Sequence, residues 1–290
     1  MIYSPLRYPG GKAKLAPFMG LMIDKINLAN ATYVEPFAGG AGIALDLLFN
    51  SVVENVVIND YDRAIYSFWR AVLTENERFV DYIYRVPVTT EEWFRQKEIY
   101  LNHNNKYSFE LGFSTFFLNR TNRSGIIKGG MIGGNQQNGK WKIDARFNRE
   151  NLASRVEKIG ERKADIKLYY SDVVNFIVNY LPKYENNAFV YFDPPYYKKG
   201  KQLYKNFFQN KHHQMIEKYI TENVKSNWIV TYDDVPEIIE IYKKYKIKRF
   251  DLNYSASKNR IASEIMIFQN QDMCPTNEEL ALRDININLR

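Results

Sequence analysis

Cysteine is almost absent from this 290-residue chain, which contains Cys274 and no other. A lone cysteine cannot form an intramolecular disulfide or a cysteine-cluster metal site, and such scarcity is typical of a reducing compartment. Histidine is also rare, with His103, His212 and His213 alone, which leaves few members for a histidine metal site or a catalytic triad. We therefore expect a cytoplasmic protein without a metal centre.

Long hydrophobic runs are missing as well. No segment approaches the roughly 18 apolar residues that a membrane-spanning helix needs. Residues 1–5 (MIYSP) do not resemble the apolar core of a signal peptide. The chain also shows no internal repeat and no low-complexity stretch. These absences predict an ordinary folded protein that does not enter a membrane.

Positive charge and aromatic rings are abundant. The chain has 40 Lys and Arg against 33 Asp and Glu, a net charge of +7, with 45% hydrophobic and 25% charged residues. That balance is typical of a globular protein of one large or two ordinary domains. The positive surplus favours a polyanionic partner, nucleic acid before an anionic membrane. The 22 Tyr and 18 Phe supply a core and also flat surfaces on which bases can stack.

Strand-like and helix-like segments alternate through most of the chain, which predicts an α/β fold with a doubly wound, mainly parallel sheet. The expected strands are Tyr33–Phe37, Val56–Asn59, Ile166–Tyr170, Ala188–Phe192, Trp228–Thr231, Ile247–Leu252 and Glu264–Phe268. The expected helices lie at residues 15–26, 43–49, 63–73, 173–181, 211–223 and 236–245. In such a sheet, ligands bind beyond the carboxyl ends of the strands.

The alternation breaks between about residues 75 and 150, where the spacing becomes helical and then rich in glycine. The turn signals of residues 124–139 predict a hairpin or a mobile loop. We therefore expect a catalytic domain of residues 1–74 and 151–272, an inserted, mainly helical domain plus hairpin at residues 75–150, and a C-terminal tail at residues 273–290.

A glycine turn follows the first expected strand and precedes a helix. Its residues are Glu35, Pro36, Phe37, Ala38, Gly39, Gly40, Ala41 and Gly42. Glycines allow the backbone to approach a ligand closely, and the helix N-terminus offers free N–H groups. Leu45 stands where a dinucleotide-binding loop would have its third glycine, which weakens that interpretation, and an ordinary tight turn stays a real alternative.

Two further charged residues are candidates for ligand binding. Asp60 ends the second expected strand about 20 residues past the glycine turn, where an acid commonly binds ribose hydroxyls, although helix capping by Asp60 or Asp62 is the alternative. Lys12 follows Tyr8-Pro9-Gly10-Gly11 at the expected start of a helix. There its charge opposes the helix dipole, which an anionic ligand would offset, although a solvated lysine is the simpler explanation.

The sharpest motif is Asp193-Pro194-Pro195-Tyr196 at the end of a buried apolar strand. Neither proline has an N–H group, so the chain must leave the sheet there, and a residue before proline is held extended. The result is a rigid edge with a carboxylate and a carbonyl as acceptors, followed by a ring. Such an edge suits a planar amino group, whereas a strand-ending turn is the alternative.

Together these motifs resemble the Dam-type (alpha-group, D12 class) DNA adenine-N6 methyltransferases, which use S-adenosylmethionine. The resemblance lies in the order of the motifs: Tyr8 to Lys12, the glycine turn, Asp60, Ser171-Asp172 and Asp193 to Tyr196. It implies a Rossmann-like methyltransferase fold, with the segment between the glycine turn and Asp193 as target-recognition domain.

The resemblance also implies a role for each motif. Tyr8, Lys12, the turn of residues 35–42, Asp60, Ser171 and Asp172 would bind the cofactor, with Lys12 near its methionine carboxylate. Asp193 and the Pro194 carbonyl would accept the two N6–H bonds of an adenine flipped out of duplex DNA, with Asp193 also at the edge of the cofactor site. Pro195 would stiffen this catalytic edge, and the Tyr196 ring would stack on the base.

Basic and amide side chains gather in the insertion, where they would contact DNA. The candidates are Asn119, Arg120, Asn122, Arg123, Lys128, Lys140 and Lys142, with Arg146 and Arg149 beside them. A solvated basic face is the alternative. Residues 122–125 and the glycine-rich stretch replace the Val-Pro-Phe-Gly-like run of GATC-reading relatives, so the recognition sequence stays open.

Other classes remain as alternatives. A cytosine-C5 methyltransferase needs a thiol in its catalytic loop, and Cys274 lies far from it near the C-terminus. Enzymes acting on cytosine N4, on RNA or on a protein glutamine amide use a similar edge, and a catalytically silent DNA-binding module is a further possibility. The expected partners are double-stranded DNA and a companion restriction endonuclease, with the protein as a monomer or weak dimer.

Overall fold

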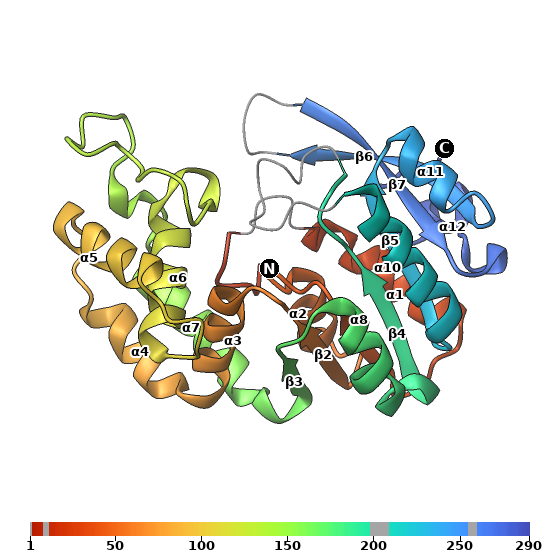
Figure 1. Ribbon diagram of the computed structural model, residues 1–290, viewed down its shortest axis with the longest axis horizontal. Helices are drawn as coiled ribbons and strands as arrows, with labels where there is room; N and C mark the ends of the chain where they lie inside the picture. Colours follow the sequence, from red (N-terminus) through yellow and green to blue (C-terminus); the bar gives the residue numbers. More distant parts are fainter. Residues whose placement is uncertain (1, 8–11, 198–208, 255–259) are drawn as a thin grey trace. The chain divides into compact units, whose positions relative to one another are not determined.

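The computed structural model describes residues 2–7, 12–197, 209–254 and 260–290. Its seven strands form one sheet in the order β3-β2-β1-β4-β5-β7-β6 (Figure 1). The strands are β1 (Thr32–Glu35), β2 (Asn55–Asn59), β3 (Ile166–Tyr169), β4 (Ala188–Phe192), β5 (Asn227–Asp233), β6 (Lys246–Tyr254) and β7 (Arg260–Phe268).

Strand direction confirms the predicted fold class. Strand β1 is parallel to β2 and β4, and β4 is parallel to β5, whereas β7 is antiparallel to both β5 and β6. The fold is therefore α/β with a mainly parallel sheet, as the alternation of elements predicted. Because β7 runs against its neighbour β5, the start of β7 lies at the edge where the parallel strands end.

The chain divides into two compact units. Unit 1 comprises Met1–Gly11, Gly39–Gly42 and Asn59–Tyr170, and unit 2 comprises Lys12–Ala38, Ile43–Ile58 and Ser171–Arg290. The predicted boundaries of the insertion, residues 75 and 150, rest on changes in sequence pattern. The assignment of residues 75–150 to target recognition stays a proposal.

Unit 2 has its core on the sheet. All residues of β1 and β4 are buried, as is typical of inner strands in a sheet covered on both faces. The helices are α1 (Ala16–Lys25), α2 (Gly42–Phe49), α8 (Val173–Asn175, followed by a π-helical turn at Phe176–Tyr180), α10 (Asn210–Asn223), α11 (Pro236–Ile241) and α12 (Asn277–Leu282). Arg290 pairs with the outer side of β6, where Arg249 and Arg290 exchange backbone hydrogen bonds of 2.9 and 2.8 Å.

Unit 1 is mainly helical. Its helices are α3 (Arg63–Thr74), α4 (Asn76–Arg85), α5 (Thr90–Leu101), α6 (Phe109–Thr121) and α7 (Arg149–Glu161). Phe68, Phe79, Phe113 and Phe116 are buried and lie 5.3–6.2 Å from one another in the pairs that touch. These rings explain much of the high aromatic content, since α3, α4 and α6 pack through them.

The glycine-rich stretch after α6 is a loop of turns. It contains two short 3-10 helices, Arg123–Gly125 and Ile143–Arg146, and one antiparallel bridge between Asn122 and Met131. Of the two predicted forms, hairpin or loop, the structure shows a turn-rich loop closed by a single bridge.

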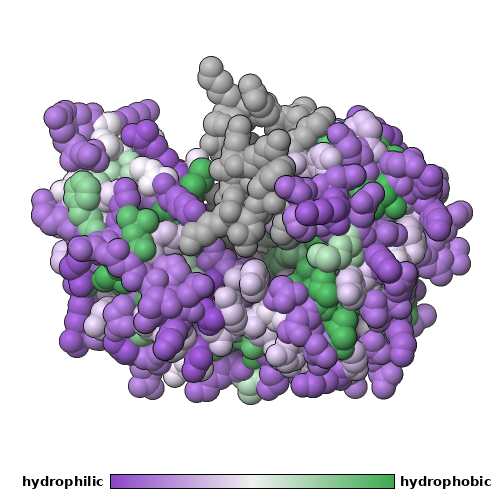
Figure 2. All heavy atoms as spheres, in the orientation of Figure 1, coloured by the Kyte–Doolittle hydropathy of each residue, from purple (hydrophilic) through white to green (hydrophobic). Residues whose placement is uncertain are grey.

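The surface gives no sign of a membrane segment. Among the described residues, no helix has the length and apolar character needed to cross a bilayer. Figure 2 shows that on the drawn face the described side chains are mostly hydrophilic, with apolar ones in separate small areas.

Candidate active site

Asp193 stands just past the end of β4, and two side chains of unit 2 hold its carboxylate. The Lys12 ammonium donates to Asp193 Oδ1, and the Thr231 hydroxyl donates to the same oxygen at 3.0 Å. The Asp193 side chain keeps 25% of its surface exposed. Among the described residues, both hydrogen bonds to the Asp193 carboxylate end on Oδ1.

Lys12 and Tyr196 share a second carboxylate, that of Glu264. The Tyr196 hydroxyl donates to Glu264 Oε1 at 2.7 Å, and Lys12 Nζ lies 3.5 Å from Glu264 Oε2 and 4.8 Å from the centre of the Tyr196 ring. The side chains of Lys12 and Glu264 are 1% and 0% exposed. Lys12 is therefore not a solvated lysine. Its ammonium lies between two carboxylates, which compensates for part of its burial.

Two polar residues of β5 complete this cluster. Thr231 lies between Asp193 and Tyr191, whose hydroxyl is 2.7 Å from the Thr231 hydroxyl. Asp233 Oδ1 accepts the backbone N–H of Tyr197 at 2.9 Å, which fixes the chain after the two prolines. Burial, followed by the charge of Asp193, raises the pKa of Tyr191 well above its ordinary value, so Tyr191 stays a neutral hydroxyl.

Sequence reasoning missed Thr231, Asp233 and Glu264. Each is a polar residue in or beside an otherwise apolar strand run, and that interruption was the available signal. The position of Glu264 also depends on the direction of β7. Because β7 is antiparallel to β5, its first half lies at the carboxyl edge of the parallel strands.

Glu35 ends β1 and holds the start of α2. Its Oε1 accepts the backbone N–H of Ala44 at 3.2 Å. Burial is the main reason that the pKa of Glu35 rises to about 8, so this carboxyl group is mostly protonated at neutral pH. Pro36 and Ala38 are buried and Phe37 is half-buried, so this part of the predicted cofactor motif packs against the protein.

In unit 1, Asp60 is tied to the glycine turn. Its Oδ2 accepts the backbone N–H of Gly39 at 2.9 Å, and its Oδ1 accepts that of Asp62 at 2.8 Å. Burial, followed by the charge of Asp62, raises the pKa of Asp60 to about 7. Asp62 in turn caps α3 by accepting from Ala64 at 2.8 Å. Of the two aspartates, Asp62 caps the helix, and Asp60 accepts a hydrogen bond from the glycine turn.

The turn itself has an unusual backbone that is fixed from both sides. Gly39 and Ala41 have φ angles of 47° and 45°, a region that glycine occupies easily and alanine rarely. The Gly39 carbonyl accepts from Trp69 Nε1 at 2.9 Å, and the Gly40 carbonyl accepts from the Ser4 hydroxyl at 2.5 Å. Gly42 begins α2. The turn is therefore rigid before any ligand binds.

The remaining predicted cofactor residues have local roles. The buried Ser171 accepts from Asn175 Nδ2 at 2.5 Å, and Asp172 caps α8 by accepting from the Asn175 backbone at 2.9 Å. Tyr8 lies outside the described residues. Contact of Ser171, Asp172 and Tyr8 with a cofactor stays a prediction.

Two of the predicted DNA-binding residues are buried and serve the loop. Asn119 bonds the backbone of Arg7 in both directions, at 2.7 and 3.1 Å, and donates to the Gly125 carbonyl at 2.8 Å. Asn122 accepts from Trp93 Nε1 at 2.6 Å and donates to the carbonyls of residues 126 and 127. Both amides are 1% exposed or less, so they hold the loop against α6.

The predicted cations differ in how far they reach solvent. Arg120 donates to the Arg146 carbonyl at 2.8 and 2.5 Å, and burial, with the charges of neighbouring arginines, lowers the pKa of Arg120 to about 9. The exposed cations are Arg123, Lys128, Lys140, Lys142 and Arg146. These five remain the candidates for phosphate contacts.

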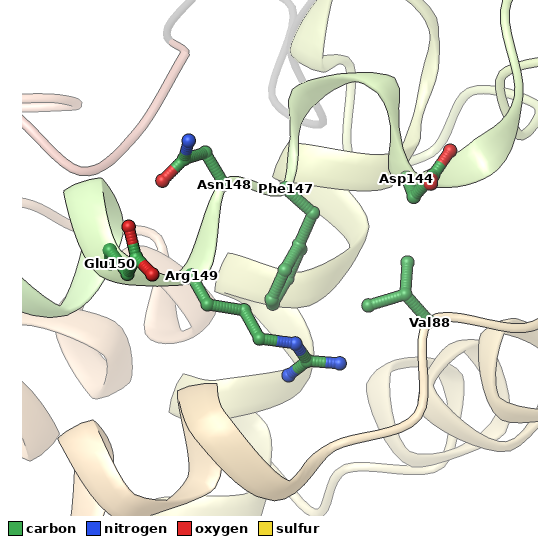
Figure 3. Close-up of a pocket in the computed structure, with 6 residues that line it drawn as sticks. All are labelled: Val88, Asp144, Phe147, Asn148, Arg149 and Glu150. Atoms are coloured by element: carbon green, nitrogen blue, oxygen red, sulfur yellow. The ribbon is translucent and has the colours of Figure 1, made fainter.

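A pocket of about 480 Å³ lies in unit 1 between the α4–α5 connection and the start of α7 (Figure 3). It is lined by Val88, Asp144, Phe147, Asn148, Arg149 and Glu150. Asn148 caps α7, and the Arg149 guanidinium donates to the carbonyls of residues 84 and 86 at 3.0 and 2.6 Å. Two polar residues of the pocket, Asn148 and Arg149, thus hold helices in place.

Comparison with known proteins decides the family. The family of D12 class N6 adenine-specific DNA methyltransferases matches residues 8–256, which include every predicted cofactor and catalytic motif. The chain belongs to this family. It is 24% identical over 204 residues to the type II methyltransferase M.MjaIII of Methanocaldococcus jannaschii, a match that covers 66% of this chain and 68% of that protein.

Solved structures resemble the chain only loosely. The RNA-methyltransferase candidate PH1948 of Pyrococcus horikoshii aligns with a TM-score of 0.41 at 11% identity, covering 90% of this chain and 82% of its own. The rRNA methyltransferase aviRa of Streptomyces viridochromogenes aligns with a TM-score of 0.40 at 12% identity, covering 92% and 88%. The family match thus identifies the chain as a DNA methyltransferase.

Proposed function

We propose that this methyltransferase moves a methyl group from S-adenosylmethionine to the N6 atom of an adenine in duplex DNA. Family membership supports the reaction class. The observation that carries the assignment to an amino group is the Asp193 carboxylate. Its Oδ1 is fixed by Lys12 and Thr231, its side chain keeps one quarter of its surface exposed, and Pro194 follows directly.

The chemical difficulty of the reaction is the weak nucleophilicity of the amino group. The lone pair of N6 is delocalised into the purine ring, so the planar amine attacks poorly. Acceptors placed for a pyramidal nitrogen bind the transition state better than the ground state. Asp193 and the Pro194 carbonyl would serve as these acceptors. Because proline fixes the backbone dihedrals at this edge, neither acceptor needs to reorganise during the reaction.

Lys12 is better placed to orient Asp193 than to bind the cofactor carboxylate that the sequence resemblance suggested. Its ammonium contacts both Asp193 and Glu264 and is almost completely buried. A cation at this place holds Asp193 by a charge-assisted hydrogen bond, which is stronger than one between neutral groups. Glu264 also holds the Tyr196 hydroxyl, so it would orient the ring that we expect beside the target base.

The residues near the glycine turn fit the cofactor. When bound, S-adenosylmethionine supplies a methyl group on a positively charged sulfur. Asp60 uses one acceptor position on each oxygen for backbone N–H groups. A carboxylate offers about four such positions, so two remain for ribose hydroxyls. The backbone of Gly39 to Gly42, rigid and free of large side chains, would allow close approach of the cofactor.

Base flipping is part of the proposal. In a duplex the N6 amino group is paired and stacked, so it cannot reach an edge built from Asp193 and Pro194. The adenine would have to be extruded, which costs a few kcal/mol, and its ring would be held by stacking. The exposed cations of the loop after α6 would hold the phosphates and place the duplex.

Purified protein incubated with methyl-labelled S-adenosylmethionine and a panel of duplex DNA, single-stranded DNA and RNA tests this proposal. We expect label in duplex DNA, and a loss of at least a thousandfold in the Asp193→Ala variant. Asp81→Ala, which removes a surface carboxylate of α4, is the matched control and should keep full activity. Label in RNA alone, or an active Asp193→Ala variant, would contradict the proposal.

The likeness to a type II methyltransferase supports a companion restriction endonuclease as partner. The relative is named as a type II methyltransferase, and a companion endonuclease for this chain is a proposal that rests on that likeness. Location in the cytoplasm and a monomeric or weakly dimeric state fit access to chromosomal DNA and stay predictions.

A further inference from the structure

Trp141 is the one tryptophan of this chain that faces water. Its side chain is 62% exposed, whereas the other three tryptophans, Trp69, Trp93 and Trp228, are at most 3% exposed. A tryptophan left in water forfeits the large hydrophobic gain that its burial would give. Tryptophans that remain exposed on a surface often mark a binding site, since this residue is enriched among the residues that dominate interface energies.

The loop that carries Trp141 is braced by hydrogen bonds. The side-chain amide of Gln137 lies inside it and donates to the carbonyls of Ile132 and Gly134 at 2.9 and 2.7 Å. The Gln137 Oε1 accepts the backbone N–H of Ile143 at 2.8 Å. One side chain thus joins the two ends of the segment of residues 132–143. Figure 1 shows this loop, in yellow-green between α6 and α7, extending beyond the ends of α5 and α6.

Glycines bring the loop backbone into contact directly beneath Trp141. A Cβ atom on Gly133, whose φ is +85°, would lie 2.8 Å from the Trp141 carbonyl oxygen. A Cβ atom on Gly139 would lie 3.0 Å from the Gly133 Cα. Both positions therefore require glycine. The loop places the indole ring with a defined backbone, which lowers the entropy that binding would otherwise cost.

Positive charge lies beside the ring. Lys140 and Lys142 flank Trp141 in the sequence and are exposed. Lys140 Nζ lies 5.7 Å from the indole ring centre, and the Lys142 ammonium donates to the Gln137 carbonyl. A phosphate drawn to these two lysines would bring its attached base next to the indole. An aromatic ring between cations is the arrangement with which proteins hold nucleic acid strands, charge for the backbone and ring for the base.

We propose that Trp141 stacks on a nucleobase of the DNA substrate whose face is uncovered when the duplex opens at the target site. The proposal rests on DNA being the substrate, but it concerns a contact separate from the Asp193 edge. Bases within an intact duplex are covered on both faces by their neighbours, so a stacking ring acts where the stack is interrupted.

Intrinsic fluorescence tests the contact without methyl transfer. Because the other three tryptophans are buried, Trp141 should supply the solvent-exposed part of the emission, and Trp141→Phe should remove it. The probes are a 20-base-pair duplex with one unpaired adenine, the same duplex fully paired, and inorganic polyphosphate, which offers charge without bases. Phe94→Ala removes another exposed aromatic of unit 1 (51% exposed) and is the matched control.

We expect the duplex with the unpaired adenine to quench the exposed emission and polyphosphate to leave it unchanged. Trp141→Ala should weaken binding of that duplex about 5- to 100-fold, Trp141→Phe should retain part of the affinity, and Phe94→Ala should match the wild type. Equal affinity of Trp141→Ala and wild type, or equal quenching by polyphosphate, would overturn the stacking contact. A protein that binds and quenches in this way but methylates no adenine would contradict the proposed function and leave the contact standing.

Discussion

One ammonium and two carboxylates share a buried space at the end of β4. Lys12 contacts both Asp193 and Glu264. The Thr231 hydroxyl donates to one oxygen of Asp193, and the Tyr196 hydroxyl donates to one oxygen of Glu264. Removing one partner of a buried ion pair leaves an uncompensated charge and costs about 3–5 kcal/mol. Variants of the charged members, Asp193→Ala included, therefore need their folding checked by circular dichroism beside their activity, and the hydroxyl donors give an independent test.

The Thr231→Val variant should lower the single-turnover rate of methyl transfer about tenfold. The change removes the hydroxyl that holds Asp193 Oδ1, and one hydrogen bond to a charged group is worth about 1.5–3 kcal/mol. Affinity for S-adenosylhomocysteine should change less than twofold. Thr121→Val, which removes a buried hydroxyl bonded to a carbonyl within α6, is the control. Equal rates in both variants would show that Thr231 does not orient the carboxylate.

Glu35 should make the protein less stable as pH rises. Its pKa in the folded state is about 8, above the ordinary 4.5, so the folded protein holds a proton that the unfolded chain releases. The free energy of unfolding must then fall between about pH 4.5 and pH 8. Denaturant unfolding at pH 5, 7 and 9 should show Glu35→Gln losing a few kcal/mol less than wild type. Asp60, with its pKa of about 7, is present in both proteins and cancels. Parallel curves for the two proteins would contradict this assignment.

At this scale, the sequence predicted residues whose place follows from the local chain. Asp193 is predictable because two prolines force the strand to end there. The spacing of Asp60 and Asp62 allows one to cap a helix while the other binds elsewhere. In the structure Asp62 caps α3, and Asp60 accepts a hydrogen bond from the glycine turn. Glu264 was beyond reach, since its contact with Tyr196 depends on pairing between distant strands. Asn119 and Asn122 are predicted DNA contacts because of the resemblance and their place in the basic insertion. Both are buried and hold the loop, a role that the sequence did not reveal, and their contact with DNA stays a prediction.

Among the elements, α3 and α6 pack with their backbones in close contact. A Cβ atom on Gly112 of α6 would lie 2.4 Å from the Ser67 carbonyl oxygen of α3. The nearest atoms on α3 belong to the backbone of Ser67 and Phe68. Backbone atoms cannot move aside as the end of a flexible side chain can. The two helices therefore depend on a glycine at this position, although helical spacing alone would accept alanine better.

Gly112→Ala should lower the free energy of unfolding by about 1–3 kcal/mol, the usual cost of inserting a methyl group into a packed contact. Gly130→Ala is the matched control, because a Cβ atom there would have no neighbour within 4 Å, and its effect should stay within about 0.5 kcal/mol. Urea unfolding followed by far-ultraviolet circular dichroism measures both. A Gly112→Ala protein as stable as the Gly130→Ala protein would show that α3 and α6 can separate at little cost.

The elements themselves were largely predictable, for a physical reason. The strands and helices of unit 2 have clear apolar periods and ends marked by glycine, proline or aspartate. The stretch after residue 173 was predicted as one helix, and the structure divides it into α8, a π-helical turn and a 3-10 turn. The direction of β7 and the braced form of the glycine-rich loop depend on contacts between distant residues, which periodicity does not encode.

For the whole molecule, we expect positive charge to govern the binding of DNA. The net charge is +7, and five exposed cations, Arg123, Lys128, Lys140, Lys142 and Arg146, follow α6. If each neutralises one phosphate, the slope of log affinity against log salt should be near −0.9 × 5, or about −4.5. Duplex affinity should then fall roughly five-hundredfold between 50 and 200 mM salt. An affinity that stays flat over this range would contradict a phosphate-binding role for the loop.

We propose that Asp193 and Pro194 present two acceptors to the amino group of adenine. Nucleoside analysis by mass spectrometry of duplex DNA, digested after incubation with the protein and S-adenosylmethionine, tests this most directly. We expect N6-methyladenine with the wild-type protein and none with Asp193→Ala. N4-methylcytosine as the product, or N6-methyladenine made equally well by Asp193→Ala, would contradict it.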